Sequence, residues 1–125
     1  MTTRVLLVAL IMTAVYIADQ SHAQDPVAVS PHIYTVLFEN EEIRVIELTF
    51  EPGEREAMHS HPKYCIVTKE GGTLRIHTEG NEPRDADIQV DQPRLLDPVT
   101  AHWAENVSDT TVRVIAVEYK GLVSE

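Results

Sequence analysis

The feature that most constrains the fold of this chain is an alternation of apolar and polar residues with a period of two. Between Ile46 and Phe50, for example, every second residue is apolar and the residues between are polar. This period is typical of half-buried strands, and beyond the N-terminal residues no window has the 3.6-residue stripe of an amphipathic helix. Turn-forming clusters recur about every 8 to 12 residues, which favours an all-β sandwich or barrel. After an extended lead-in, Gln24–Pro31, the expected strands are His32–Phe38, Ile43–Phe50, Ala57–His61, Tyr64–Lys69, Thr73–Thr78, Ala86–Val90, Arg94–Leu96, His102–Asn106 and Thr111–Tyr119.

The N-terminal residues differ from this pattern. Arg4 gives a short positive region, Val5–Ala18 is nearly all apolar, and small residues lead up to Ala23. That order is typical of a secretory signal peptide. A membrane anchor is the alternative, but the apolar stretch as a helix is only about 21 Å long, short of the roughly 30 Å hydrocarbon core. We therefore expect a signal peptide over residues 1–23, one domain over residues 24–125, and a periplasmic or secreted protein without stable membrane insertion.

Charge and cysteine usage narrow the function classes. The formal net charge is -10 and no Lys/Arg cluster is present. A nucleic-acid partner is therefore not expected, because binding to phosphates needs a basic surface. Cys65 is the sole cysteine, so it forms no internal disulfide and does not indicate the redox compartment.

The segment His59-Ser60-His61 carries the main functional signal. Residues i and i+2 of a strand share one face, so both imidazoles can point at one position. Neutral imidazole is a common ligand of transition metals. His102, about 40 residues downstream at a strand entry, is the candidate third ligand. Three imidazoles with open coordination positions suit Fe, Mn, Ni or Zn as one divalent ion, and the ligand type alone does not choose among these metals.

These residues resemble the two motifs of the cupin superfamily, which comprises small antiparallel β-barrels or jelly rolls of the RmlC-like type. Its first motif is a Gly, five residues, His-x-His, three or four residues, a Glu, six residues and a Gly. Gly53, His59, His61 and Gly72 match it, and Cys65 stands where the Glu should be. Within the superfamily the chain looks most like small single-domain cupins with a His-Ser-His-Pro signature.

The second motif has a Gly, a Pro, then His, three residues and Asn. Pro98, His102 and Asn106 match it, although an extra residue separates Pro from His and Gln92 stands near the expected Gly. The resemblance covers about Ile43–Glu118 and implies that the three histidines are metal ligands. It does not select a reaction, because cupins include dioxygenases, isomerases, lyases, cyclases and non-catalytic binders.

The replacement of the motif Glu by Cys65 leaves two interpretations open. Cys65 has the strand parity of His59 and His61, so its thiolate could occupy the fourth ligand position and favour zinc or another soft-tolerant ion. Alternatively, Cys65 is a small apolar residue of the barrel wall. Pro62 can shift the phase of the strand, which would undermine the parity argument.

Two functional classes follow from the resemblance. One is a metal-dependent enzyme, an iron dioxygenase or an isomerase, acting on a small organic molecule. The other is a non-catalytic binding module of the cell envelope for a small molecule or a metal, and a degenerate barrel with an empty site is a third reading. No catalytic residue is assigned. Tyr64, Glu56 and Glu105 are candidate acid or base groups, each also interpretable as a surface or packing residue.

The remaining polar and aromatic residues of interest have structural interpretations. His77 is expected to be solvated, and His32 has no spaced partner. Asn106 is expected to fix a turn by side-chain to backbone bonding. Met58 and Trp103 flank the candidate ligands and should lie on the barrel exterior. The family resemblance, with barrel edges and an exposed Trp103, implies a homodimer.

Overall fold

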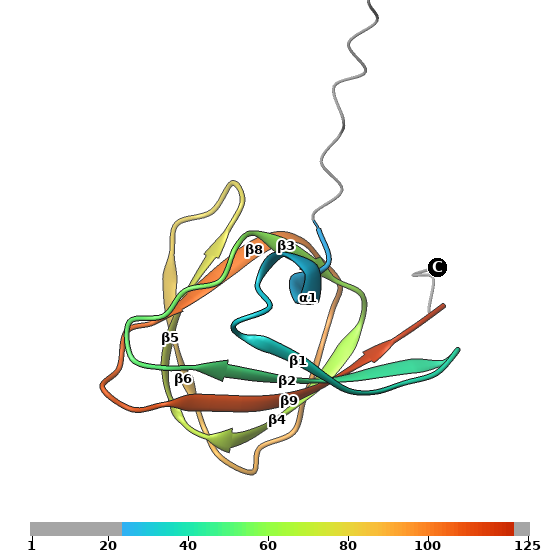
Figure 1. Cartoon of the computed structure of the whole chain (residues 1–125). Helices are drawn as coiled ribbons and strands as arrows, with labels where there is room; N and C mark the ends of the chain where they lie inside the picture. The colour runs from blue at the N-terminus through green and yellow to red at the C-terminus, as the bar shows by residue number, and fades with distance from the viewer. Residues whose placement is uncertain (1–23, 122–125) are drawn as a thin grey trace, which may run out of the picture.

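The computed structural model describes residues 24–121, which form two packed antiparallel sheets and one short helix (Figure 1). The expected signal peptide, residues 1–23, lies outside the described residues, so it stays a prediction. Within the described part of the chain, no helix is long and apolar enough to cross a membrane.

The chain passes repeatedly between two sheets, and among the described strands only β1-β2 and β5-β6 are consecutive strands of the same sheet. One sheet has five strands in the order β1-β2-β9-β4-β7, and the other has four in the order β3-β8-β5-β6. Every paired neighbour is antiparallel, which confirms the all-β barrel class. The elements are α1 (Pro26–Val29), β1 (Tyr34–Glu39), β2 (Ile43–Phe50), β3 (His59–His61), β4 (Tyr64–Glu70), β5 (Gly72–Thr78), β6 (Arg84–Ile88), β7 (Arg94–Leu96), β8 (Val99–Asn106) and β9 (Val112–Tyr119).

The main departure from the sequence prediction is α1, which forms within the lead-in that was expected to be extended. The Asp25 carboxylate accepts a hydrogen bond from the Val27 backbone N–H at 2.9 Å, and Pro26 occupies the first turn. An Asp cap followed by Pro is a helix start signal. In addition, β8 begins at Val99 rather than at His102.

The core lies between the two sheets and is filled by alternate residues of the strands. β9 shows the pattern most clearly, because Val112, Val114, Ala116 and Glu118 are buried and the residues between them are not. Glu118 is therefore an acidic side chain on a face that is otherwise apolar. The buried apolar cluster consists of Ile33, Tyr34, Ile46, Phe50, Tyr64, Leu74, Ala104, Val112, Val114 and Ala116.

The helix α1 lies against the end of β3 and joins it to the five-stranded sheet (Figure 1). The Ser30 hydroxyl, fully buried, accepts a hydrogen bond from the Ala57 N–H at 2.7 Å, and the Gln24 carbonyl accepts one from the Ser60 N–H at 3.2 Å. β3 is an edge strand, and among the described strands its neighbour in the sheet is β8. The two bonds hold β3 and the residues leading into it from the opposite side.

Three motif residues have structural roles that explain their identity. Gly53 has φ +81°, in the left-handed region that glycine adopts without strain. A Cβ on Gly72 would lie 2.5 Å from the Ser108 hydroxyl oxygen and 2.7 Å from Val112 Cγ2. The Asn106 amide donates to the Phe50 and Thr110 carbonyls at 3.0 and 2.7 Å, which confirms its expected side-chain to backbone bonding.

Candidate metal centre

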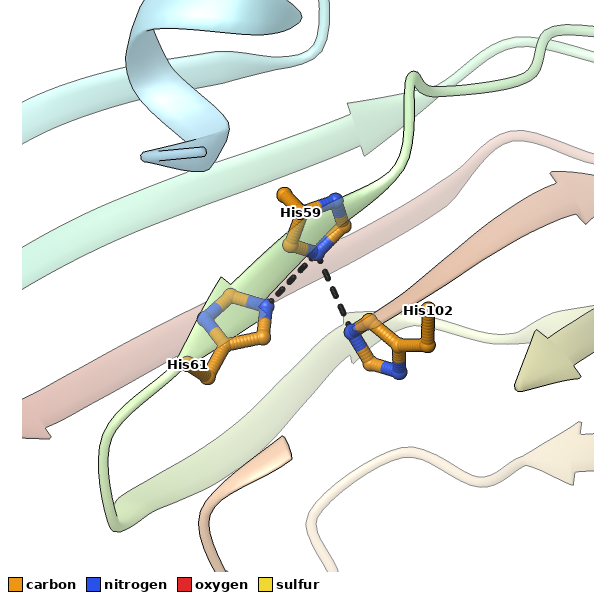
Figure 2. A group of neighbouring side chains, drawn as sticks. All are labelled: His59, His61 and His102. Carbon is orange, nitrogen blue, oxygen red and sulfur yellow. Dashed lines mark hydrogen bonds between the residues drawn. The ribbon is translucent and has the colours of Figure 1, made fainter. Parts of the chain in front are cut away.

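The structure brings His59, His61 and His102 together inside the barrel (Figure 2). His59 and His61 lie on β3 and point inward, as the period of two predicts, and both are buried. His102 lies on β8 directly opposite His59 in the antiparallel register. One ring nitrogen of each histidine falls within 4.8 Å of the others. The three predicted ligand side chains are thus one cluster.

Hydrogen bonds on the far side of two rings fix their tautomers. His59 Nδ1 lies 2.8 Å from the Ala57 carbonyl oxygen, which can only accept, so Nδ1 carries the proton and Nε2, which the Tyr34 hydroxyl approaches to 3.3 Å, presents its lone pair. His61 Nδ1 donates in the same way to Glu118 Oε1 at 2.8 Å. The two Nε2 atoms nevertheless lie 2.9 Å apart, and His102 Nε2 lies 3.0 Å from His59 Nε2.

This donor set fits one divalent metal ion. Two unprotonated nitrogens at van der Waals contact or closer repel each other unless a cation lies between them. Two ligands at right angles on an ion, each at about 2.1 Å, are about 3.0 Å apart, and the measured Nε2 to Nε2 separations are 2.9 and 3.0 Å. The imidazoles alone do not select among Fe, Mn, Ni and Zn.

Two of the histidines, His59 and His102, are also held in the neutral form that binds metals. Burial lowers the pKa of His59 to about 4, with a further lowering by the neighbouring His61. Burial, followed by the adjacent His59 and His61, lowers the pKa of His102 to about 3. At neutral pH a metal ion therefore does not compete with protons for these two rings.

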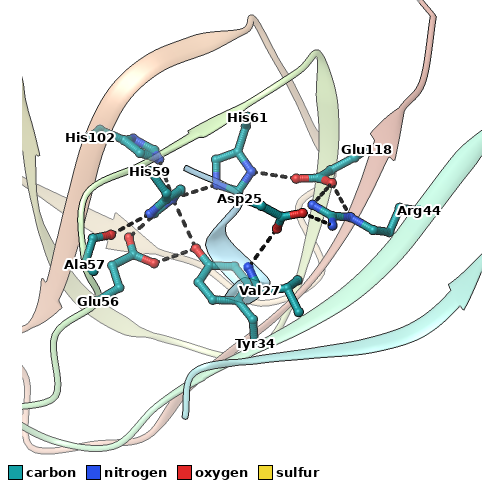
Figure 3. Close-up of polar contacts among 10 residues, drawn as sticks. All are labelled: Asp25, Val27, Tyr34, Arg44, Glu56, Ala57, His59, His61, His102 and Glu118. Atoms are coloured by element: carbon teal, nitrogen blue, oxygen red, sulfur yellow. Dashed lines mark hydrogen bonds and ion pairs between the residues drawn. The ribbon is translucent and has the colours of Figure 1, made fainter. Parts of the chain in front are cut away.

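A chain of charged groups stands behind His61 (Figure 3). The Glu118 carboxylate, which accepts from His61, also binds Arg44 at 2.6 Å, and Arg44 binds Asp25 at 2.7 Å. Burial by itself would raise the pKa of Glu118, but the hydrogen bond from His61 and the charge of Arg44 hold it below the usual value. A carboxylate behind a ligating histidine orients the ring and raises its basicity.

Sequence reasoning did not select Glu118 or Arg44. The sequence does contain a pattern that could have indicated Glu118. Alternate residues of β9 face inward, and Glu118 occupies an inward position on a strand whose other inward residues are apolar. Arg44 is its register partner on β2, which the sequence alone does not reveal.

A second carboxylate, Glu56, lies on the other side of the cluster (Figure 3). Its Oε2 accepts a hydrogen bond from the Tyr34 hydroxyl at 2.5 Å, and its Oε1 lies 3.9 Å from His59 Nε2. Burial raises the pKa of Glu56 to about 8, against the opposing effect of the Tyr34 hydrogen bond. Burial also raises the pKa of Tyr34 well above its usual value, and the Glu56 charge adds to the shift.

The other two candidate acid or base groups lie in different surroundings. Tyr64 stacks on the His61 ring with centroids 4.6 Å apart, and burial raises its pKa to about 12. Glu105 is on the outer face of β8, where it pairs with His77 at 3.1 Å. Of the three candidates, Glu56 and Tyr64 therefore adjoin the imidazole cluster, and Glu105 does not.

Cys65 does not join the imidazoles, which corrects its candidacy as fourth ligand. On β4 the even-numbered Tyr64 and Thr68 are buried in the interior, so Cys65 faces the opposite way. It pairs in register with Val117, which lies on the outward side of β9. The parity argument fails because the chain leaves strand conformation between His61 and Tyr64, which shifts the inward phase by one residue.

A small apolar cavity of about 90 Å³ adjoins the cluster inside the barrel. It is bounded by two of the imidazoles, His61 and His102, and by the Glu56 side of the site. The remaining walls are aromatic and aliphatic: Tyr34, Leu48, Phe50, Tyr64, Ile66, Leu74, Ile76, Ile88, Leu96, Ala104 and Val114. The centre thus faces a largely apolar space.

The outer face of the four-stranded sheet explains the other singled-out residues. The ring of His77 stacks on Trp103 with centroids 3.7 Å apart, so His77 is packed rather than freely solvated. Trp103 is on the exterior as expected, but this stacking leaves it only partly exposed. His32 lies outside the cluster and contacts the Arg55 carbonyl oxygen at 3.1 Å. Met58 is exposed, as expected, and further large exposed apolar side chains lie on β1 (Val36, Leu37 and Phe38), on β7 (Leu95) and in loops (Val90 and Val107).

Comparison with known proteins places the fold. No protein-family model and no curated protein sequence matches the chain. Among solved structures, a cupin domain from Bordetella pertussis Tohama I is similar, with 27% identity, coverage of 71% of this chain and 93% of that chain, and a TM-score of 0.67. An RmlC-like cupin family protein with a double-stranded β-helix fold from Methanocaldococcus jannaschii shows 13% identity, coverage of 70% and 79%, and a TM-score of 0.58.

The described residues therefore form a small double-sheeted β-barrel with three imidazoles turned inward. This is the cupin fold, the RmlC-like double-stranded β-helix, as the sequence resemblance predicted. The narrower likeness to cupins with a His-Ser-His-Pro signature stays a prediction.

Proposed function

We propose that the protein is a metal-dependent enzyme in which His59, His61 and His102 hold one divalent ion. The reaction class is iron-dependent dioxygenation of a small organic molecule. The observation that supports the proposal most strongly is that the Nε2 atoms of His59 and His61 face each other 2.9 Å apart, while each Nδ1 is bonded to an acceptor oxygen. Three imidazoles fill only part of the coordination sphere of such an ion, so positions remain open, as in catalytic metal sites.

The chain's own residues prepare this site for chemistry. The Ala57 carbonyl and the Glu118 carboxylate hold His59 and His61 in the tautomers that present Nε2. The apolar walls of the cavity exclude water, which strengthens electrostatic interactions within the site. Bound iron would supply a Lewis acid and an electron donor for dioxygen.

The cavity limits the size of the substrate. At about 90 Å³ it exceeds the roughly 30 Å³ share of one water molecule, but it is smaller than an engineered cavity of about 150 Å³ that accepts benzene. The part of the substrate that enters should therefore have only a few heavy atoms and an apolar body. A polar end would meet the metal between His61 and His102, which both line the cavity.

Anaerobic purification followed by elemental analysis tests the metal site. The wild type should contain one metal ion per chain, and a His59→Ala/His61→Ala variant should lose it. His77→Ala is the matched control, because this histidine stacks on Trp103 on the outer face and should leave the metal content unchanged. Stoichiometric metal that persists in the double variant would refute the site.

Oxygen uptake by the iron-loaded protein tests the reaction. The probes are small molecules with two neighbouring oxygen, nitrogen or sulfur donors on a short apolar body. Uptake that depends on one of these probes supports dioxygenation. A protein that holds only zinc and consumes no oxygen contradicts it. Tight binding of a probe, seen as a thermal shift without turnover, would instead support the alternative of a non-catalytic binding module.

A further inference from the structure

We propose that Glu56 supplies the fourth ligand of this centre, in the place of the glutamate that the motif lacks at Cys65. The inference rests on the proposed function, because it requires an ion held by the three histidines. Glu56 precedes His59 in the chain, whereas the glutamate position of the motif, occupied by Cys65, follows His61.

The position of the carboxylate carries the inference (Figure 3). The Glu56 side chain is 3% exposed, and its Oε1 lies 3.9 Å from His59 Nε2. Two ligands on one ion at about 2.1 Å are separated by about 3.0 Å at right angles and about 4.2 Å when opposite. The measured distance falls within this range, so Oε1 reaches the ligand set without a large movement of the chain.

Hydrogen bonds hold Glu56 in this orientation. The Tyr34 hydroxyl donates to Oε2, which leaves Oε1 as the oxygen nearer His59. The Glu56 N–H donates to the Ala104 carbonyl at 3.1 Å, two residues along β8 from His102. The Tyr34 bond thus orients the carboxylate, and the Ala104 bond ties the Glu56 backbone to β8, the strand that carries His102, as expected of a preorganised ligand.

The charge distribution gives an independent reason. Arg44, which lies behind His61 through Glu118, is already paired with Glu118 and Asp25. The ion-pair contact of Glu56 within the described chain is with the His59 imidazole alone. Ionisation of a buried carboxyl group without a cation is strongly unfavourable, so Glu56 needs a neighbouring cation to act as a carboxylate. A divalent ion at the imidazoles would supply the missing positive charge.

The test compares Glu56→Gln with the wild type, using Co²⁺ as the probe metal. Gln keeps the size of the side chain and removes the anionic ligand. We expect Co²⁺ affinity, measured by calorimetric titration, to fall at least about 100-fold, since even a residue behind a ligand contributes about 10- to 100-fold. The visible absorption of bound Co²⁺ should also change. The matched control Glu105→Gln removes a carboxylate from the outer face and should leave both readouts unchanged.

Stability of the metal-free protein separates a ligand from a structural residue. Glu56→Gln should unfold at the same temperature as the wild type or higher, because the carboxylate has no cationic partner to lose. Glu56→Asp keeps a carboxylate and should retain a wild-type-like Co²⁺ spectrum at lower affinity. Wild-type affinity and spectrum in Glu56→Gln would overturn the inference and leave the three-histidine site intact. So would weakened binding accompanied by a destabilised metal-free protein, whereas a wild type without Co²⁺ binding would refute the proposed function as well.

Discussion

Replacement of Glu118 by Gln should weaken both the fold and the metal site, for two separable reasons. The carboxylate is 3% exposed and accepts from His61 Nδ1 at 2.8 Å and from Arg44 at 2.6 Å. Removal of one partner of a buried ion pair costs about 3 to 5 kcal/mol. We expect a loss of about 3 kcal/mol in the free energy of unfolding, at the lower end of this range, because Arg44 keeps its contact with Asp25 at 2.7 Å. Loss of the carboxylate behind His61 should reduce metal affinity about 10- to 100-fold.

Urea unfolding of the metal-free protein and calorimetric titration with Co²⁺ measure the two effects. The informative control is the double variant Arg44→Met/Glu118→Gln. Removal of both charges should restore most of the lost stability, because no buried charge is left unpaired. Metal affinity should stay low, because His61 still lacks its anionic acceptor. Wild-type affinity in Glu118→Gln would refute the role assigned to the carboxylate, whatever happened to stability.

Three further predictions concern pH, assembly and processing. The pKa values of His59 and His102 are about 4 and about 3, below the ordinary 6.5. The unfolded chain therefore binds more protons than the folded chain as the pH falls. The free energy of unfolding of the metal-free protein should decrease by about 2 kcal/mol per histidine between pH 7 and pH 5. Glu56 has a pKa of about 8 against an ordinary 4.5, so its protonation in the folded state has the opposite effect and stabilises the fold as the pH falls. The unfolding free energy measured with urea should therefore decrease more steeply between pH 7 and pH 5 in Glu56→Gln than in the wild type. Equal slopes against pH would contradict this. We expect a homodimer that pairs through the edge strand β1, where Phe38 is 53% exposed. In sedimentation experiments, Phe38→Lys should then behave as a monomer. A monomeric wild type would count against the dimer. Mass spectrometry of the exported protein should find its N-terminus immediately after Ala23, and an uncleaved chain would refute the signal peptide.

The sequence was sufficient for the all-β class and for the histidine cluster, because both depend on local periodicity. His59 and His61 share a face by strand geometry alone. His102 joins the pair because β8 is the sheet neighbour of β3 and places His102 opposite His59.

The features that sequence reasoning missed depend on phase and on register. Cys65 has the right parity only if β3 and β4 are one continuous strand, and the interruption at Pro62 turns it outward. The pairing of Glu118 with Arg44 depends on the alignment of β9 with β2, which no local pattern encodes. Glu56 is one of three candidate acid or base groups in the sequence, and its position beside Tyr34 and His59 follows only from the folded structure.

The bond from His61 to Glu118 crosses from one sheet of the barrel to the other, because β3 belongs to the four-stranded sheet and β9 to the five-stranded sheet. His59, His61 and His102 all belong to the four-stranded sheet, so an ion bound by them would act on the five-stranded sheet through this bond. A cation on Nε2 makes the His61 Nδ1–H a stronger donor, so separation of the sheets would require rupture of a stronger bond. Hydrogen exchange should accordingly slow on metal loading in β9 as well as in β3, so the metal would govern how often the barrel opens.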